Sequence, residues 1–223
     1  MICGLIFDLD GVIVDTAKYH FLAWKELANT MGLRFTKKDN ERLKGVSRVR
    51  SLEIILEING VTLPETQKQA YCTQKNDRYL EYIRQLREDE ILPGAKEFLL
   101  NARLAGFRIA LGSASKNTAL ILEKLNITAL FDAVIDGTKV TRAKPDPEVF
   151  VRGAEEIGIP PAQCAVFEDA EAGVDAAHNA GMLAVGIGSR KRLPMADLNI
   201  PGLLGVTPEA LIAKLTKRRA SRA

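Results

Sequence analysis

Residues 2–15 read Ile-Cys-Gly-Leu-Ile-Phe-Asp-Leu-Asp-Gly-Val-Ile-Val-Asp, and this stretch decides the fold. Its first part, residues 2–7, is an apolar run with the length and side chains of a β-strand buried on both faces. Asp8 and Asp10 follow two positions apart, so their side chains leave the carboxyl end of the strand in the same direction. In an open parallel sheet that end faces the ligand crevice. Two carboxylates this close repel each other unless a cation or a shared proton intervenes, which indicates metal-assisted chemistry.

The Asp-x-Asp pattern alone has a second interpretation. The strand could end in an ordinary polar turn, in which Gly11 supplies an unusual backbone angle. Polar residues also follow or flank other predicted strands further along the chain. If those residues suit phosphate and metal binding, they favour the metal site over the ordinary turn.

The composition is that of an ordinary globular protein. The chain has 223 residues, of which 47% are hydrophobic and 26% charged, so it suits one large domain or a domain with a small insert. A net charge of +3 is too weak to indicate binding to nucleic acid. The basic residues near the end fit a solvated helix end, and they are Lys214, Lys217, Arg218, Arg219 and Arg222.

Cysteine usage indicates a reducing compartment. Cys3, Cys72 and Cys164 are odd in number and have no paired spacing, which argues against a disulfide framework. The chain enters a core strand without a signal peptide, and no apolar run approaches the roughly 20 residues that span a bilayer. We therefore expect a cytoplasmic protein with no nucleic-acid and no membrane partner.

Residues 15–90 differ from the rest because they predict helices and no strand. Helices are expected over residues 19–31, 47–59 and 64–86. The second of these ends at Asn59-Gly60, a common helix stop. The sequence therefore predicts a small helical bundle inserted after the first strand.

From residue 93 onward, predicted helices and strands alternate. This rhythm indicates an α/β fold, a parallel sheet with helices on both faces joined by right-handed crossovers. Helices are expected over residues 94–106, 116–125, 146–157, 170–180 and from 208 onward. Strands are expected over residues 107–111, 133–135, 164–167 and 183–187, with an edge strand over 203–206.

A serine-rich turn follows the strand expected over residues 107–111. It reads Gly112-Ser113-Ala114-Ser115-Lys116-Asn117 and leads into a helix. A small hydroxyl followed by backbone N–H groups at a helix start can cradle a phosphate. Taken alone, the same turn fits a plain helix cap.

A lysine and a second acidic pair come next. Lys144, stiffened by Pro145, lies before a predicted helix, and a lysine is a compact cation suited to phosphate oxygens. Glu168 and Asp169 end the strand expected over residues 164–167. Carboxylates of this kind suit Mg²⁺. A surface lysine and a polar strand end are unremarkable when each is taken alone.

These residues occur in a fixed order, each at the end of a predicted strand: an aspartate pair, a hydroxyl, a lysine and an acidic pair. In that order the chain resembles the haloacid dehalogenase superfamily of phosphotransferases over residues 2–187. The resemblance implies a Rossmann-like parallel-sheet core of the haloacid dehalogenase type with an inserted helical cap domain. Residues 1–14 and 91–223 would form the α/β catalytic core, and residues 15–90 the cap.

The inserted helices carry a closer resemblance. They contain Thr16, His20 and Trp24 after the first strand, Lys44-Gly45-Val46-Ser47-Arg48 with Ser51 between helices, and Lys75-Asn76-Asp77 in the last one. Alone, His20 fits a structural histidine, and Arg48 and Lys75 fit solvated helix charges. Together with the serine-rich turn, these residues resemble the β-phosphoglucomutase family within the superfamily.

The resemblance implies a role for each matching residue. Asp8 would be the nucleophile that forms an aspartyl phosphate, and Asp10 the general acid–base. Mg²⁺ would be held by Asp8, Asp10, Glu168 and Asp169. Substrate and phosphate would be bound by Thr16, His20, Trp24, Lys44, Gly45, Arg48, Ser51, Lys75, Ser113, Ala114, Ser115, Lys116, Asn117 and Lys144.

The implied reaction converts β-D-glucose 1-phosphate to D-glucose 6-phosphate through β-glucose 1,6-bisphosphate, under a cap that excludes water. The expected partner is a small phosphosugar, and the expected oligomeric state is a monomer. A magnesium-dependent phosphosugar phosphatase of the same superfamily, in which water takes the phosphoryl group, is the alternative. A catalytically silent phosphosugar-binding protein is a third class, and the intact set of Asp8, Asp10, Lys144 and Asp169 argues against it.

Overall fold

The computed structural model describes residues 1–43 and 46–220 and contains two compact units. Met1–Asp15 and Arg87–Ala223 form the first, here named the core unit, and Thr16–Leu86 form the second, the cap unit. The second junction lies before the predicted one at residue 90. Glu88 accepts hydrogen bonds from Lys96 at 2.6 Å and from Asn126 at 2.7 Å, and these contacts tie it to the core unit.

The core unit is built on a parallel sheet with the strand order β3-β2-β1-β4-β5-β6. The strands are β1 (Gly4–Phe7), β2 (Arg108–Gly112), β3 (Ala133–Ile135), β4 (Cys164–Glu168), β5 (Leu183–Ile187) and β6 (Leu198–Ile200). The order reverses at β1, which lies between β2 and β4. In such sheets the ligand crevice opens at the carboxyl ends of the strands where the order reverses. Asp8 directly follows β1 and therefore lies at that point.

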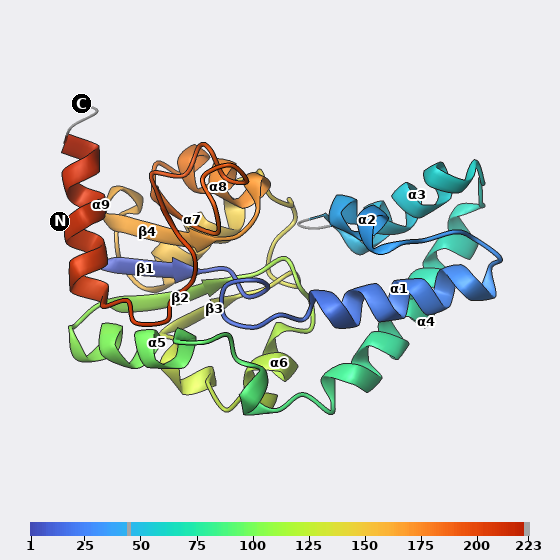
Figure 1. Ribbon diagram of the computed structural model, residues 1–223, viewed down its shortest axis with the longest axis horizontal. Helices are drawn as coiled ribbons and strands as arrows, with labels where there is room; N and C mark the ends of the chain where they lie inside the picture. The colour runs from blue at the N-terminus through green and yellow to red at the C-terminus, as the bar shows by residue number, and fades with distance from the viewer. Residues whose placement is uncertain (44–45, 221–223) are drawn as a thin grey trace. The chain divides into compact units, whose positions relative to one another are not determined.

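Helices cover both faces of this sheet, as predicted. They are α5 (Ala95–Leu104), α6 (Thr118–Lys124), α7 (Glu148–Glu156), α8 (Glu171–Asn179) and α9 (Pro208–Ala220). Short 3₁₀ turns add η2 (Glu88–Glu90), η3 (Thr128–Leu130) and η4 (Pro161–Gln163). Helices α7 and α8 lie together on one face, and α5 lies on the other with α9 beside it (Figure 1).

Alternate residues of the central strand face the two helix layers. Ile6 packs with Phe150 and Val174, which come from α7 and α8. Phe7 points to the opposite face, where its ring stacks on Phe167 at 4.4 Å and meets Phe98 of α5 edge-on at 6.0 Å. The apolar run that defines the first strand is therefore buried on both sides, which is why it can hold Asp8 in a fixed place.

The predicted edge strand over residues 203–206 is wrong. The edge strand is β6, which lies earlier in the chain and pairs with β5 in parallel. Residues 203–206 instead form a turn, in which the Val206 N–H donates to the Leu203 carbonyl at 3.1 Å. Leu203 is buried and Leu204 is 70% exposed, so this apolar run anchors a loop and does not pair with a strand.

The cap unit is helical. It contains α1 (Ala17–Thr30), α2 (Lys37–Asn40), the 3₁₀ turn η1 (Glu41–Leu43), α3 (Arg48–Asn59) and α4 (Glu65–Ile83). Ser47 caps the start of α3 through the N–H of Arg50, and Gly60 ends that helix in the left-handed conformation. Apolar side chains of α1, α3 and the α1–α2 loop form its core, among them Trp24, Phe35 and Leu52.

Two further expectations concern the chain as a whole. Cys3, Cys72 and Cys164 are free thiols, in agreement with the absence of paired cysteine spacing. Within the described part of the chain, no helix has the length and apolar character needed to cross a membrane.

Candidate active site

The site in the core unit is built around Asp8 and Lys144. The N–H of Asp8 donates to the Phe167 carbonyl at 2.9 Å, which continues the ladder between β1 and β4 past the end of the strand. The ammonium group of Lys144 lies 2.5 Å from Oδ1 of Asp8 and 2.8 Å from Oε1 of Glu168, and donates to the Gly112 carbonyl at 3.2 Å. One buried lysine therefore joins the carboxyl ends of β1, β2 and β4.

Glu168 is held on both of its oxygens. Oε1 accepts from Lys144, and Oε2 accepts from the Ala170 N–H at 2.7 Å. The side chain lies against Gly173 of α8, where any Cβ would overlap the carboxyl group of Glu168. A glycine at this helix position is therefore required by the site, and sequence reasoning missed it.

Burial and charge act in opposite directions on this group of residues. Burial raises the pKa of Asp8 well above its usual value, Lys144 lowers it, and the Glu168 carboxylate raises it again. Burial lowers the pKa of Lys144, but the two carboxylates outweigh burial, and its pKa is raised. Lys144 therefore stays charged at neutral pH, and its charge opposes the effect of burial on the pKa of Asp8.

Gly11 brings the two acidic pairs together. It adopts a left-handed φ of +78° and its N–H donates to the Val14 carbonyl at 2.8 Å, which makes a tight turn directly after Asp10. A Cβ on Gly11 would meet the Asp169 carboxyl group. Asp169 therefore lies against the turn that follows Asp8 and Asp10.

The donor set in the core unit fits Mg²⁺ by its chemistry. The acidic side chains there offer the hard oxygen atoms that Mg²⁺ prefers, and burial of Asp8 calls for a cation. Across residues 1–43 and 46–220, no group of three His, Cys, Asp or Glu side chains is preassembled around a common metal position. The same carboxylates take part in ion pairs: Asp8 and Glu168 with Lys144, and Asp169 with Arg192.

The serine-rich turn after β2 is pinned by its own hydroxyl groups. Ser113 is buried, its N–H donates to the Ile135 carbonyl at 2.9 Å, and its hydroxyl accepts from the Ser115 N–H at 3.1 Å. The Ser115 hydroxyl in turn accepts from the Asn117 N–H at 3.2 Å. Since the Ser113 oxygen accepts this bond, its proton remains to be donated to a ligand. Ala114 and Lys116 are exposed on the same turn.

Glu148 fixes the loop that carries Lys144. One oxygen of Glu148 accepts from the N–H of Thr141 at 3.0 Å and of Arg142 at 2.9 Å, and the other pairs with Arg152 at 2.9 Å. Asn179 of α8 donates to the Pro145 carbonyl at 3.0 Å. The loop is thus tied to α7 and α8 on both sides of the lysine. Sequence reasoning missed Glu148, whose only signal is an acidic residue in the first turn of a helix.

In the cap unit, residues spaced by four along two helices meet. Thr16 directly precedes α1 and is followed at intervals of four by His20 and Trp24 of that helix, while Lys75 and Tyr79 are spaced by four on α4. The Lys75 ammonium group is 2.6 Å from Nδ1 of His20 and lies over the rings of Trp24 and Tyr79. The His20 and Tyr79 rings stack at 4.1 Å, and the Tyr79 hydroxyl donates to Thr16 at 3.2 Å. The structure thus brings four predicted residues together and adds Tyr79.

Arg48 and Ser51 lie on α3 of the same unit. The Arg48 guanidinium donates to the Asn76 side-chain oxygen at 2.6 Å, and burial lowers its pKa from the usual value. Ser51 is buried and its hydroxyl donates to the Ser47 carbonyl at 3.0 Å. The predicted residues Lys44 and Gly45 lie outside the described part of the chain.

Comparison with known proteins adds independent information. The sequence profile of the haloacid dehalogenase-like hydrolase family matches residues 3–181. Over 210 residues the chain is 43% identical to the β-phosphoglucomutase of Bacillus subtilis (strain 168), with 93% of each chain covered. It is 33% identical over 186 residues to the fructose-1-phosphate phosphatase of Escherichia coli (strain K12), covering 82% of this chain and 95% of the relative. The crystal structure of a β-phosphoglucomutase from Clostridium difficile superposes with a TM-score of 0.93 at 37% identity, covering 99% of this chain and 100% of the other.

Proposed function

The chain belongs to the haloacid dehalogenase-like hydrolase family, and from that membership we propose that it acts as a β-phosphoglucomutase. Such an enzyme interconverts β-D-glucose 1-phosphate and D-glucose 6-phosphate through β-glucose 1,6-bisphosphate. The observation that carries this function is a cation centre in each unit, Lys144 beside Asp8 in the core and Lys75 with Arg48 in the cap. A sugar bisphosphate has two phosphates, and each needs cations to bind it.

Asp8 is assigned as the nucleophile. Its carboxylate attacks the phosphorus atom, the bond from phosphorus to the donor oxygen breaks, and an aspartyl phosphate results. Lys144 supports this role because it binds Oδ1 at 2.5 Å and so fixes the position of the carboxylate. The phosphoryl group then passes from Asp8 to a hydroxyl of the sugar, and the second half-reaction repeats these steps on the other end.

Asp10 is assigned as the general acid–base. It gives a proton to the sugar oxygen that leaves phosphorus and takes a proton from the sugar hydroxyl that attacks it. Asp10 lies two residues beyond the nucleophile and directly before the tight turn at Gly11, and this position supports the division of roles. The two carboxylates therefore perform different chemistry from neighbouring positions.

The transferring phosphoryl group is assigned to Ser113, the Ala114 N–H and Lys144. Ser113 supports this role with a hydroxyl proton left for donation, and Lys144 with a charge held beside Asp8. In a loose transition state the negative charge spreads over the phosphoryl oxygens, and preorganised donors stabilise it at no further cost of ordering.

Magnesium is the proposed cofactor. Asp8, the backbone carbonyl of Asp10, and Asp169 would hold it, with Glu168 close by and held by Lys144. When bound, the ion supplies positive charge that offsets the charge of the phosphoryl oxygens. The chain's own contribution is to keep these carboxylates at one sheet edge and to keep Lys144 charged among them.

The cap unit is assigned the distal phosphate and the sugar. The planar guanidinium of Arg48 suits two oxygens of a phosphate, and Asn76 orients it. His20 is kept neutral because burial, Lys75 and Arg48 all lower its pKa well below 6.5, so it can hydrogen-bond a sugar hydroxyl. Further pocket residues proposed are Thr16, Trp24, Lys44, Gly45, Ser51, Lys75, Ser115, Lys116 and Asn117. A small phosphosugar is thus the expected partner of a monomer, and the free thiols suit the cytosol.

The fructose-1-phosphate phosphatase among the relatives defines the alternative, in which water is the final acceptor. The deciding assay supplies β-glucose 1-phosphate, Mg²⁺ and a trace of the bisphosphate, and follows glucose 6-phosphate and inorganic phosphate separately. We expect glucose 6-phosphate to form much faster than inorganic phosphate. A faster release of inorganic phosphate would replace the mutase with the phosphatase.

A further inference from the structure

Arg192 contacts a residue of the proposed metal site, and no role assigned above explains it. One nitrogen of its guanidinium group, Nη2, donates to the backbone carbonyl of Asp169 at 2.5 Å and to its carboxylate oxygen Oδ2 at 3.0 Å. The same nitrogen lies 3.4 Å from the Ile187 carbonyl at the end of β5. Arg192 therefore links the ends of β4 and β5 through the acidic residue itself.

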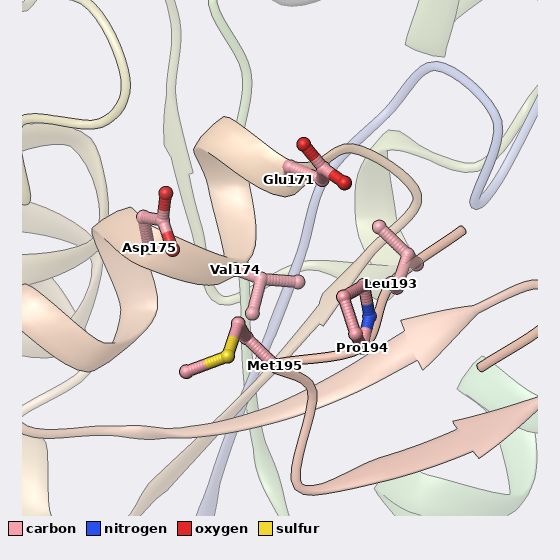
Figure 2. A pocket seen from close by; sticks show the side chains of 6 residues that line it. All are labelled: Glu171, Val174, Asp175, Leu193, Pro194 and Met195. Atoms are coloured by element: carbon pink, nitrogen blue, oxygen red, sulfur yellow. The ribbon is translucent and has the colours of Figure 1, made fainter. Parts of the chain in front are cut away.

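The loop that carries Arg192 is anchored on both sides of the residue. The Ser189 carbonyl accepts from the N–H groups of Arg192 and Leu193, both at 3.0 Å, which closes a turn. Leu193 is buried in the core beside Val174 of α8. Figure 2 shows this packing at the pocket lined by Glu171, Val174, Asp175, Leu193, Pro194 and Met195. The guanidinium group is thus carried by a fixed turn.

The guanidinium group lies over Gly188, where an added Cβ would come to an ordinary contact distance of 3.5 Å from the guanidinium carbon. It is the backbone that favours glycine here, because this residue adopts a φ of +136°, which other residues rarely adopt. The side chain of Arg192 is 51% exposed and that of Asp169 only 18% exposed. The pair therefore lies at the solvent edge of the site, with the carboxylate on the inner side.

We propose that Arg192 is a positioning residue that acts as a resident counter-cation for Asp169 and thereby weakens the affinity of the core for its divalent cation. The inference rests on the proposed function, since it takes Asp169 as a ligand of that cation. The guanidinium group donates to Oδ2 of Asp169. Its positive charge would therefore be separated from a cation bound to Asp169 by that carboxylate alone. The guanidinium group and the divalent cation would repel each other, because both are positively charged. The negative charge of Asp169 would also be shared between them, which weakens its attraction for the metal.

The charges of the site are consistent with this role. Asp8, Asp10, Glu168 and Asp169 contribute four negative charges when ionised, and Lys144 and Arg192 offset two of them. Without Arg192 the site would lose one of these two positive charges and would attract a divalent cation more strongly.

A purely structural role of Arg192 predicts the opposite sign. If the guanidinium group served only to orient Asp169, its removal would let the carboxylate move and would weaken metal binding. A counter-cation role predicts tighter binding once the charge is gone. The sign of the change in metal affinity therefore separates the two roles without any measurement of turnover.

The experiment titrates the full chain with Mg²⁺ by isothermal titration calorimetry. We expect Arg192→Gln to lower the Mg²⁺ dissociation constant about tenfold. Arg192→Lys keeps the charge and should stay within about twofold of the wild type. Lys191→Gln is the matched control, because it removes a charge from the adjacent exposed position and should also stay within about twofold.

Thermal unfolding provides the second readout. The rise in Tm on adding Mg²⁺ should be larger in Arg192→Gln than in the wild type, because tighter binding to the folded state stabilises it more. Unchanged or weaker Mg²⁺ binding in Arg192→Gln would overturn the inference, and so would a lysine variant that binds as tightly as the glutamine variant. If the wild type itself shows no Mg²⁺ binding, the metal site of the proposed function fails as well. Binding by the wild type with no gain in Arg192→Gln removes this inference alone.

Discussion

The ammonium group of Lys75 lies 2.6 Å from Nδ1 of His20, a histidine whose own pKa is lowered well below 6.5. An ammonium group has only hydrogens to give, so Nδ1 must accept the bond and the ring proton must be on Nε2. Protonation of His20 would place a second positive charge against Lys75. The cap unit therefore folds around a neutral histidine.

This relationship predicts a dependence of stability on pH. The unfolded chain binds a proton at His20 near its usual pKa of about 6.5, whereas the folded chain does not until a much lower pH. Below pH 6.5 the unfolded state binds more protons, so the free energy of unfolding falls as the pH falls. When the pH is lowered from 7.5 to 5.0, the free energy of unfolding measured in urea should fall by about 1–2 kcal/mol less in His20→Gln than in the wild type.

The chain's other histidine provides the control for this measurement. His178→Gln should leave the loss due to His20 in place, because His178 lies in the core unit beside Asp197. An unchanged pH dependence in His20→Gln would show that His20 is not the group held neutral in the fold.

Replacement of the nucleophile should abolish turnover. Asp8→Asn keeps the shape of the side chain and an oxygen that can accept from Lys144, but removes the negative charge that attacks phosphorus. We expect glucose 6-phosphate formation to fall by at least about a thousandfold. Asp15→Asn, in the same stretch of sequence, is the matched control. Near-normal turnover in Asp8→Asn would remove Asp8 from its assigned role.

Removal of the metal should have the same effect reversibly. Excess chelator should abolish glucose 6-phosphate formation and added Mg²⁺ should restore it, because the carboxylates around Asp8 add negative charge where phosphate must bind. Mg²⁺ at about 100 times its dissociation constant should also stabilise the fold by about 2.7 kcal/mol. Full activity in excess chelator would assign the acidic residues a structural role only.

Gly173 provides a test of the support under Lys144. A Cβ at this position would overlap the Glu168 carboxyl group, so Gly173→Ala must displace Glu168 from Lys144 and from the Ala170 N–H. We expect the free energy of unfolding, measured in urea, to fall by about 1–3 kcal/mol, although alanine has a higher helix propensity than glycine. Turnover should fall as well, because Lys144 loses one of its two carboxylate partners.

Gly153 of α7 is the matched control for that substitution. A Cβ there would meet its nearest neighbours at 3.5 Å, which is ordinary contact. Gly153→Ala should therefore be neutral or stabilising by up to about 1 kcal/mol. Equal stability of the two variants would show that the close packing of Glu168 against Gly173 does not contribute to the free energy of unfolding.

The comparison of sequence and structure shows which features are readable from local pattern. Strands β3 and β5 lie where the apolar runs predicted them, at Ala133–Ile135 and Leu183–Ile187. The β5 run is buried throughout and the β3 run at two of its three residues, so hydrophobicity alone identifies both. The edge strand Leu198–Ile200 was missed because it is short and mixed, while the more apolar run over residues 203–206 serves a loop.

Residues of the site divide in the same way. The acidic pairs could be found because they lie at strand ends in a parallel sheet, where all carboxyl ends meet. Lys144 could be found from its place in the ordered pattern, on the loop before a predicted helix. The roles of Gly173 and Arg192 depend on contacts across the core unit with Glu168 and Asp169. No local periodicity encodes such contacts. Tyr79 lies between these cases, because its spacing of four from Lys75 could have indicated a shared helix face.

Arg48 is the residue that separates the mutase from the phosphatase. Both reactions use Asp8 in the same way, but only the bisphosphate requires a second cation site that accepts either end of the sugar. Arg48→Ala removes the guanidinium group that Asn76 orients. Loss of a charge-assisted contact to phosphate costs about 2–3 kcal/mol, so affinity for the bisphosphate should fall about a hundredfold.

The assay for Arg48→Ala compares two reactions of the same variant. Isomerisation of β-glucose 1-phosphate should fall sharply, whereas formation of the aspartyl phosphate from a small phosphoryl donor should stay close to the wild-type rate, because the core unit is unchanged. Arg50→Ala is the matched control, since Arg50 lies on the same helix but is exposed and pairs with Glu53 and Glu57. Normal isomerisation by Arg48→Ala would place the second phosphate elsewhere. Loss of both reactions would mean that Arg48 supports the fold, and the distinction between mutase and phosphatase would then have to lie in another cap residue.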